Sequence, residues 1–271
     1  MDAQKIVKTC FRDRVLPGAS LLWDMAVEDL KSGYKGAVLG GTWVFIRPAV
    51  VILVYYVVFE FFFGMELEFS NVPYAIWFLS GMLPWLYFAD TLGGGITCYQ
   101  EYSYLVGKIY FPIRLLPMVK VVSGFFVHLV FMMILGAACI FSGSVWRIRL
   151  PVLMYSAVCI LVYTGLSVRL GAIIRVFFRD VSEFTGLFLQ AGIWAVPILW
   201  DFNKVPASYR KYFALNPMFH IVTGYREAFG CGTGTGDHLF SAPVFWEMCF
   251  LLAVITGVLF RRLEGEIRGE S

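Results

Sequence analysis

Few side chains in this 271-residue chain have the types and spacing that catalysis or metal binding requires. The three histidines, His128, His220 and His238, are far apart and form no His-Glu-x-x-His pattern, the arrangement in which two helical histidines bind zinc. The six cysteines include no Cys-x-x-Cys pair, and most stand in apolar stretches, where cysteine packs as a small hydrophobic residue. We therefore expect no catalytic residue, no metal site and no disulfide framework.

A nucleotide site is not expected in this chain either. The Gly107-Lys108 pair lacks the first glycine and the hydroxyl residue of a G-x-x-x-x-G-K-S/T phosphate loop. The glycine-rich run 230–236 (GCGTGTG) looks like a dinucleotide loop, but no strand precedes it and no helix opens on it, so we read it as a flexible connection. Any ATP and magnesium that the protein's activity needs must then be held by another subunit.

The composition places almost the whole chain in a membrane. It is 59% hydrophobic and 15% charged, whereas soluble domains are about half apolar. At about 1.5 Å per residue, a helix over the apolar run 43–63 spans the roughly 30 Å core of a bilayer. Further apolar runs bounded by charge, proline or glycine cover 74–97, 117–141, 151–177, 184–200 and 243–260.

These runs predict an all-α integral membrane protein with six transmembrane helices in a single domain, 1–271. Its parts are a cytoplasmic and interfacial segment 1–40, a helical bundle 41–260 and a cytoplasmic tail 261–271. Lysine and arginine stay on the cytoplasmic side during insertion, and a cytoplasmic N-terminus puts sixteen of them on that side and six on the other. Both termini are therefore expected in the cytoplasm. The basic N-terminus lacks the apolar core of a signal peptide, and nothing indicates nucleic-acid binding.

Two segments beside the spans have helical patterns of their own. In 21–36, apolar Leu22, Met25, Ala26 and Leu30 share one face while the charges lie mostly elsewhere, which predicts an amphipathic helix on the membrane surface.

Between the fifth and sixth spans, the fragments 209–215 and 217–229 are too short to cross singly. The Asn216-Pro217 pair that separates them is a good helix start. We expect a re-entrant helical hairpin on the outer side.

Charges inside a bilayer are costly, so each one is a candidate functional group. Asp90 and Arg169 stand at similar estimated depth near the cytoplasmic ends of spans two and four, and we expect them to pair. Glu60 and Glu247, near the outer ends of their spans, are expected to reach the headgroups.

Five local patterns together resemble the membrane subunit of ABC-2 type transporters, in the group that exports lipid-linked polysaccharides such as O-antigen, capsule and teichoic acid. The resemblance covers nearly the whole chain in the family's order and spacing. The patterns are EDLKSGYKGAVLGGTWVFIRP (28–48), YAIWFLSGMLPWLYF (74–88), SYLVGKIYFPIRLLP (103–117), FFRDVSEF (177–184) and LNPMFHIVTGYREAF (215–229).

The resemblance implies a homodimer in the bacterial inner membrane, paired with two copies of a nucleotide-binding subunit. It also implies that the amphipathic helix, 21–36, and the loop between spans two and three, 101–114, contact that subunit. The expected coupling residues are Glu28, Asp29, Lys31, Tyr34, Glu101, Tyr102, Ser103, Tyr104 and Lys108. An ordinary solvated turn is the alternative reading of the loop.

Aromatic faces stack on sugar rings, so aromatic residues are the natural lining of a sugar path. The expected path residues are Tyr55, Tyr56, Phe59, Trp77, Trp85, Tyr87, Trp194 and Trp200. The alternative reading is an aromatic belt at the membrane interfaces.

Two further groups complete the expected sites. Arg175, Arg179 and Asp180 form a polar corner that could meet the pyrophosphate of a lipid carrier or pin the amphipathic helix. The outer gate is expected at Pro197, Asn216, Pro217, Arg226 and Glu227, with a stable lid as the alternative.

The expected function is export of a lipid-linked polysaccharide by an ATP-driven transporter of which this chain is the membrane subunit. The alternatives are an ABC-2 exporter of a drug or simple lipid, and a membrane enzyme acting on lipid-linked sugars.

Overall fold

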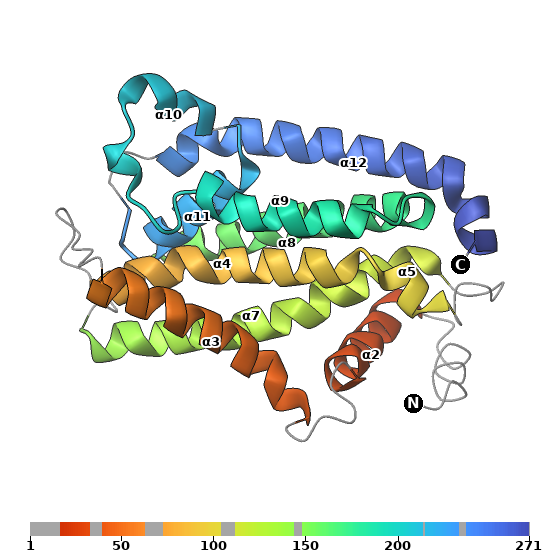
Figure 1. Cartoon of the computed structure of the whole chain (residues 1–271), viewed down its shortest axis with the longest axis horizontal. Helices are drawn as coiled ribbons and strands as arrows, with labels where there is room; N and C mark the ends of the chain where they lie inside the picture. The colour runs from red at the N-terminus through yellow and green to blue at the C-terminus, as the bar shows by residue number, and fades with distance from the viewer. Residues whose placement is uncertain are drawn as a thin grey trace.

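A computed structural model describes residues 17–32, 40–62, 73–103, 112–143, 148–213, 215–232 and 237–270. Throughout these ranges the regular structure is helical and no strand occurs, which confirms the predicted all-α class. The long helices run side by side along one axis (Figure 1). They are α3 (Trp43–Val57), which continues as a π-helical turn (Val58–Phe62), α4 (Tyr74–Gly95), α7 (Leu116–Phe141), α8 (Leu150–Phe177), α9 (Val181–Ala195) and α12 (Asp237–Glu270).

The boundaries of these helices follow local sequence signals. Pro117 and Pro151 stand in the first turns of α7 and α8, where a missing N–H costs no hydrogen bond. Helix α9 is shorter than the predicted fifth span, 184–200, because it ends at Ala195. Val196 is extended with ψ 139°, as expected for a residue that precedes a proline, here Pro197.

Four helical stretches of the described chain are long and apolar enough to cross a membrane. They are Gly40–Glu60, Ile113–Phe141, Leu150–Phe177 and Ser241–Ile267. The first overlaps most of the predicted first span, 43–63, and the other three contain the predicted third, fourth and sixth spans. Helices α4 and α9 occupy the predicted second and fifth spans but are not among these four. A multi-pass membrane protein is thereby established, while the count of six spans stays a prediction.

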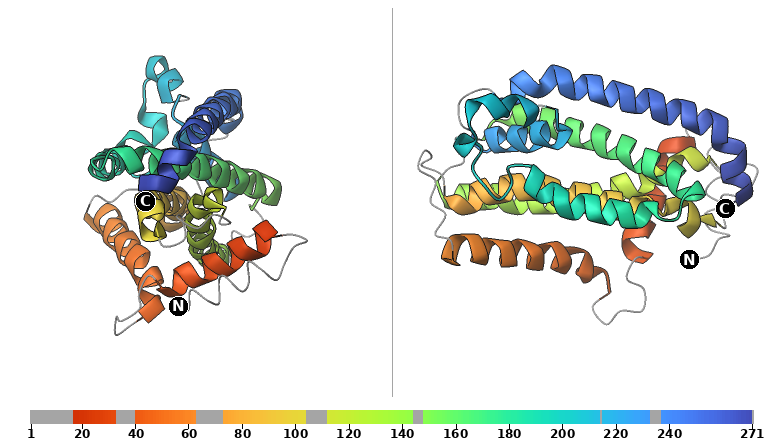
Figure 2. Two further views of the ribbon diagram at one scale, coloured as in Figure 1. Left: turned by 90° about the vertical axis from the view of Figure 1, so that its right-hand side faces the viewer. Right: turned by 45° about the horizontal axis from the view of Figure 1, so that its top comes forward.

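Helix α2 (Pro17–Ser32) lies across the long helices rather than along them (Figure 2). Its apolar residues Leu21, Met25 and Ala26 are buried, and its main neighbour is α7. On its other side Asp24 is exposed, so the predicted amphipathic character holds for the described part. This crosswise packing is the geometry expected of a helix at a membrane surface.

The predicted hairpin between the fifth and sixth spans contains two short helices, α10 (Ala207–Phe213) and α11 (Pro217–Ala228). The Asn216 side chain accepts a hydrogen bond of 3.0 Å from the Met218 N–H, which confirms the predicted helix start. Helix α11 is largely buried and packs against α4, α8 and α12. Helices α10 and α11 lie at the end of the bundle opposite α2 and α5 (Cys98–Glu101), as Figure 1 shows.

Glycines allow α4 and α8 to approach each other closely near the α5 end. A Cβ added to Gly171 of α8 would lie 2.6 Å from Ile96 Cγ2, and one added to Gly95 would lie 2.5 Å from Val168 Cγ1. Ile96 and Val168 are themselves buried and β-branched, so they have little freedom to move away.

We expect Gly171→Ala to destabilise the protein by about 1–3 kcal/mol, because the added methyl overpacks the α4–α8 contact. Thermal unfolding of the purified protein in detergent measures the effect as a lower midpoint temperature. Gly257→Ala in α12 is the matched control, since nothing lies within 4 Å of a Cβ at that position. Equal midpoints for the two variants would contradict the close α4–α8 contact.

Candidate functional site

Asp29 of α2 is the centre of a polar junction between three elements. Its Oδ1 accepts hydrogen bonds from Lys120 Nζ at 2.8 Å and from the Tyr102 hydroxyl at 2.7 Å. Its Oδ2 accepts one from Ser123 Oγ at 2.7 Å. Because Lys120 and Ser123 belong to α7 and Tyr102 follows α5, one carboxylate connects α2 to both elements.

Lys120 extends this junction to a second carboxylate. Its Nζ lies 2.7 Å from Glu101 Oε2, and Glu101 Oε1 accepts a hydrogen bond of 2.7 Å from Thr97 Oγ1. The Lys120 and Asp29 side chains are only 17% and 13% exposed, whereas Glu101 is 45% exposed. The Lys120–Asp29 pair is therefore the better shielded from water and salt, and it contributes more than a surface ion pair.

The junction brings together predicted coupling residues from both segments. Asp29 and Tyr102 point into it, and Glu101 stands at its exposed side. Lys31 lies outside it and is exposed on α2. Glu28 and Ser103 are partly buried. Tyr34, Tyr104 and Lys108 lie outside the described residues.

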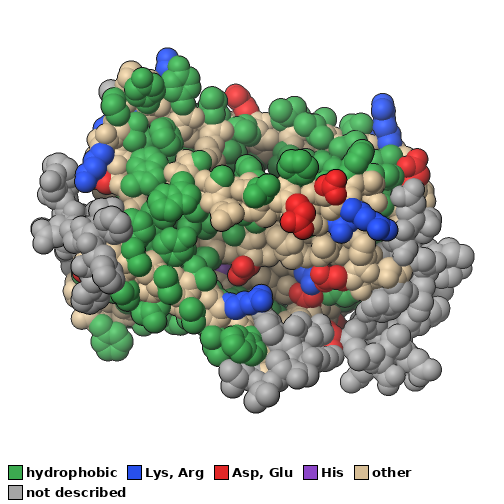
Figure 3. Space-filling model, in the orientation of Figure 1, with side chains coloured by type: hydrophobic (Ala, Val, Ile, Leu, Met, Phe, Trp, Pro, Cys, Tyr) green, Lys and Arg blue, Asp and Glu red, His purple; other side chains and the backbone are tan. Residues whose placement is uncertain are grey.

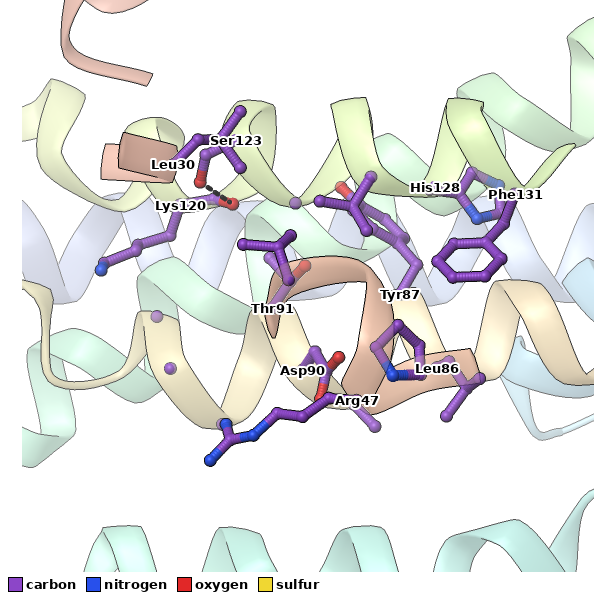
Figure 4. A pocket seen from close by; sticks show the side chains of 18 of the residues that line it. Leu30, Arg47, Leu86, Tyr87, Asp90, Thr91, Lys120, Ser123, His128 and Phe131 are labelled. Carbon is purple, nitrogen blue, oxygen red and sulfur yellow. Dashed lines mark hydrogen bonds between the residues drawn. The ribbon is translucent and has the colours of Figure 1, made fainter. Parts of the chain in front are cut away.

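A cavity of about 430 Å³ adjoins the junction (Figure 4). Its walls come from the end of α2, from α3, from the second half of α4 and from the first half of α7. Asp29 and Lys120 form part of its lining, so the junction and the cavity share a wall. Figure 3 shows charged side chains gathered in a hollow on the face where α3 and α4 lie.

Arg47 of α3 and Asp90 of α4 also line this cavity. No ion pair joins Asp90 to Arg169 within the described chain. Arg169 instead places its guanidinium 5.0 Å from the centre of the Phe260 ring of α12. The predicted Asp90–Arg169 pair is wrong because similar depth does not make two helical residues face each other.

The predicted path aromatics occupy several different environments. Trp77, Trp85 and Tyr87 of α4 are buried within the subunit, and of these three only Tyr87 lines the cavity. Tyr55, Tyr56 and Phe59 pack against the same core from α3 and its π-helical turn. Trp194 is 57% exposed and its carbonyl accepts a hydrogen bond from the indole of Trp200. Their role in a path stays a prediction.

The polar corner follows the end of α8. Arg175 Nε donates a 2.6 Å hydrogen bond to Ser182 Oγ of α9. Arg179 and Asp180 are exposed in the turn between the two helices. The corner is therefore accessible, and its ligand stays a prediction.

Predicted gate residues hold α11 in place. The Arg226 guanidinium lies 3.8 Å from the centre of the Trp77 ring and donates a 2.9 Å hydrogen bond to the Ile198 carbonyl. Pro197 and Pro217 are buried, and Glu227 pairs with Arg149 at 3.0 Å. Arg226 and Glu227 thus have separate partners on different elements.

His128 and His220 both make contacts that hold α11. His128 Nε2 lies 2.9 Å from the Tyr225 hydroxyl. His220 lies 3.1 Å from the Tyr155 hydroxyl and 2.9 Å from Ser241 Oγ. In the part of the chain that the structure describes, no group of three His, Cys, Asp or Glu residues could hold a metal ion.

No family model matches the chain. It is 30% identical over 215 residues to the O-antigen export system permease protein RfbA of Myxococcus xanthus, which covers 77% of this chain and 80% of that relative. Two proteins of the same name from Klebsiella pneumoniae are 23% and 24% identical over 255 residues, 90% of this chain and 93% of each relative. The chain belongs to the O-antigen export permease family. This confirms the family resemblance seen in the sequence.

Several residues at the centre of the permease's polar junction and cavity were not recognised from sequence. Lys120, Ser123, Arg47 and Thr91 all line the cavity. Lys120 and Arg47 did carry a signal, because each is an isolated charge within a helix that is otherwise apolar. Ser123 and Thr91 carried none, since small hydroxyl residues are common in membrane helices.

We expect Lys120→Met to destabilise the permease by on the order of 2 kcal/mol, because it leaves Asp29 and Glu101 facing each other without their shared cation. Adding Asp29→Asn to Lys120→Met should recover part of the loss, since the remaining repulsion falls. Thermal unfolding of the single and double variants gives the coupling.

Arg114→Gln is the matched control at the same end of the bundle. It breaks the 2.8 Å pair with Glu264, whose side chains are 56% and 31% exposed, and should cost less than about 1 kcal/mol. If the Lys120 and Arg114 variants unfolded at the same temperature, the junction would be no stronger than a surface pair.

Proposed function

We propose that this permease is the membrane-spanning subunit of an ATP-driven ABC exporter that moves a lipid-linked polysaccharide of the O-antigen type out of the cytoplasm. The relationship to the Myxococcus xanthus permease over 80% of its length carries this proposal. The long apolar helices support it, because they suit a protein that acts within the bilayer.

The ATPase of this exporter is a separate subunit. ATP and magnesium bind there, and this chain acts as a transport subunit rather than an enzyme. We place the assembly in the bacterial inner membrane as a homodimer with two ATPase subunits and with both termini cytoplasmic. In this arrangement α2, α5 and the end of α12 form the cytoplasmic end of each permease.

The proposed ATPase contact uses the outward side of the Asp29 junction. Lys31 is exposed and Glu101 is 45% exposed, so both are accessible to a partner. Asp29 and Tyr102 lie behind them and hold the surface in shape. Lys120 of α7 pairs with Asp29 of α2 and with Glu101 of α5. A displacement of α2 or α5 by the ATPase is then transmitted to α7 through these two ion pairs.

The polysaccharide would cross beside aromatic side chains of α3, α4 and α9. The α8–α9 corner would contact the carrier headgroup, and α10 and α11 would form the outer gate. These roles rest on residue chemistry: aromatic faces stack on sugars, and arginine binds phosphate through a planar fork.

The export function is tested by depleting the permease in its own host. We expect polysaccharide to accumulate inside the cell while surface polysaccharide disappears, and a wild-type copy to restore export. Affinity purification in mild detergent should recover an ATPase subunit in equal amount, with vanadate-sensitive hydrolysis. Normal surface polysaccharide after depletion would refute the export function.

We expect Lys31→Glu to lower co-purification of the ATPase subunit several-fold, since it reverses a charge on the proposed contact. Its thermal stability should stay within about 0.5 kcal/mol of wild type, because Lys31 is exposed. Lys211→Glu, a matched reversal on exposed α10 at the opposite end, should leave co-purification unchanged. An equal effect of both variants would argue against a contact at α2.

A further inference from the structure

The cavity beside the junction contains polar groups that the protein itself does not satisfy. The Thr91 hydroxyl is buried, with 5% of the residue exposed, and has no hydrogen-bond partner in the described chain. Arg47 and Asp90 are exposed beside it and make no hydrogen bond or ion pair with any described residue. Charged side chains on membrane helices are costly unless they are paired, which indicates that something outside the subunit supplies the partners of Arg47 and Asp90.

The cavity is graded from polar to apolar along the helix axes. Lys120, Asp29 and Thr91 stand toward the α5 end, and Leu86 and Phe131 stand toward the middle of the bundle. From Lys120 to Phe131 helix α7 rises about 16 Å. A ligand with a polar head and an apolar tail fits this gradient, with the head toward α5.

The charges restrict the head group further. A simple anion would be repelled by Asp29 and Asp90, and a simple cation would be repelled by Arg47 and Lys120. A hydrocarbon would cover Arg47 and Asp90 without offering either side chain a hydrogen-bond partner. A phosphate that carries hydroxyl groups satisfies both kinds of side chain, because its oxygens accept from Arg47 while its hydroxyls donate to Asp90.

The size of the cavity and its aromatic wall favour a sugar as the hydroxyl-bearing part. About 430 Å³ lies within the range of roughly 300–1,000 Å³ typical of small-molecule sites. It can hold a diphosphate and the first sugar of a chain, but not a polymer. Tyr87 and Phe131 on the wall offer aromatic surface to the apolar face of a sugar ring.

We propose that this cavity binds the phosphosugar head of the lipid-linked saccharide, with Arg47 on the phosphate and Asp90 on the sugar hydroxyls. The assignment rests on the proposed export function and identifies where its substrate first docks. The same phosphate-and-hydroxyl chemistry exists in phosphatidylglycerol, which is the competing source.

Photo-crosslinking distinguishes the two lipids. The full complex with its ATPase subunit, in phosphatidylcholine nanodiscs, carries a diazirine amino acid in place of Leu86 on the cavity wall. A radiolabelled polyisoprenyl-pyrophosphate disaccharide should label it saturably, at least ten-fold more than labelled phosphatidylglycerol at equal concentration. A diazirine in place of Leu53, exposed on α3 outside the cavity, should be labelled by both without saturation.

Three variants test the residues. Arg47→Gln and Asp90→Asn should each reduce saturable labelling at least five-fold. Gly94→Leu should do the same by filling the cavity, and it should fold because a Cβ at Gly94 meets nothing within 4 Å. Arg262→Gln, on the exposed end of α12, should label as wild type. Thermal unfolding verifies that each variant is folded.

Equal labelling by phosphatidylglycerol, or unchanged labelling in all folded variants, would overturn the assignment. Surface polysaccharide of the host, measured in parallel, separates this outcome from failure of the export function. Normal export together with no saccharide labelling refutes the cavity assignment alone. Loss of the cavity signal therefore cannot be mistaken for loss of the export role.

Discussion

The ammonium group of Lys120 is the interaction on which one end of the molecule depends. It lies within 2.8 Å of Asp29 and 2.7 Å of Glu101, two carboxylates that would otherwise repel each other across a partly buried space. Helix α2 buries only a short apolar stripe and runs across the bundle, so apolar burial alone defines its orientation weakly. The directional hydrogen bonds of Asp29 with Lys120, Tyr102 and Ser123 supply the missing constraint.

At the opposite end of the bundle, polar contacts also fix the position of a helix, here α11. Helix α11 is too short to cross a bilayer, yet it is buried among α4, α8 and α12. Its polar residues Tyr225, His220 and Arg226 each find a partner on a different neighbour: α7, α8 with α12, and the turn after α9. Polar contacts on several sides fix α11 as a wall of the bundle. Movement at this end is thus easier for exposed α10 than for α11.

Local signals in the sequence predicted the boundaries of the helices well, whereas the contacts between different helices could not be predicted from them. The starts of α7, α8 and α11 depend on proline, or on an asparagine cap before it, and those effects act within one turn. The early end of α9 also has a local cause, because Val196 precedes Pro197 and is therefore extended rather than helical.

By contrast, the failed Asp90–Arg169 pair was argued from depth alone. Which face of a helix meets which neighbour depends on the packing angle, and close contacts such as Gly171 with Ile96 help to set that angle. For the same reason, only some residues of the junction were predicted from the sequence. Asp29 and Tyr102 were chosen for their segments, but the lysine that joins them is 91 residues from Asp29 in the chain.

The shared wall of junction and cavity has a thermodynamic consequence. Asp29 and Lys120 hold α2 in place and also line the cavity, so a ligand there acts on the groups that position the proposed ATPase contact. If α2 has two arrangements, a ligand that prefers one of them biases α2 toward it, and whatever holds α2 there strengthens ligand binding by the same factor. A junction built from apolar packing alone would lack this property, because a polar ligand would have no differential contact with its two arrangements. The charged residues between α2 and α7 therefore provide a physical means for the substrate and the ATPase to sense each other.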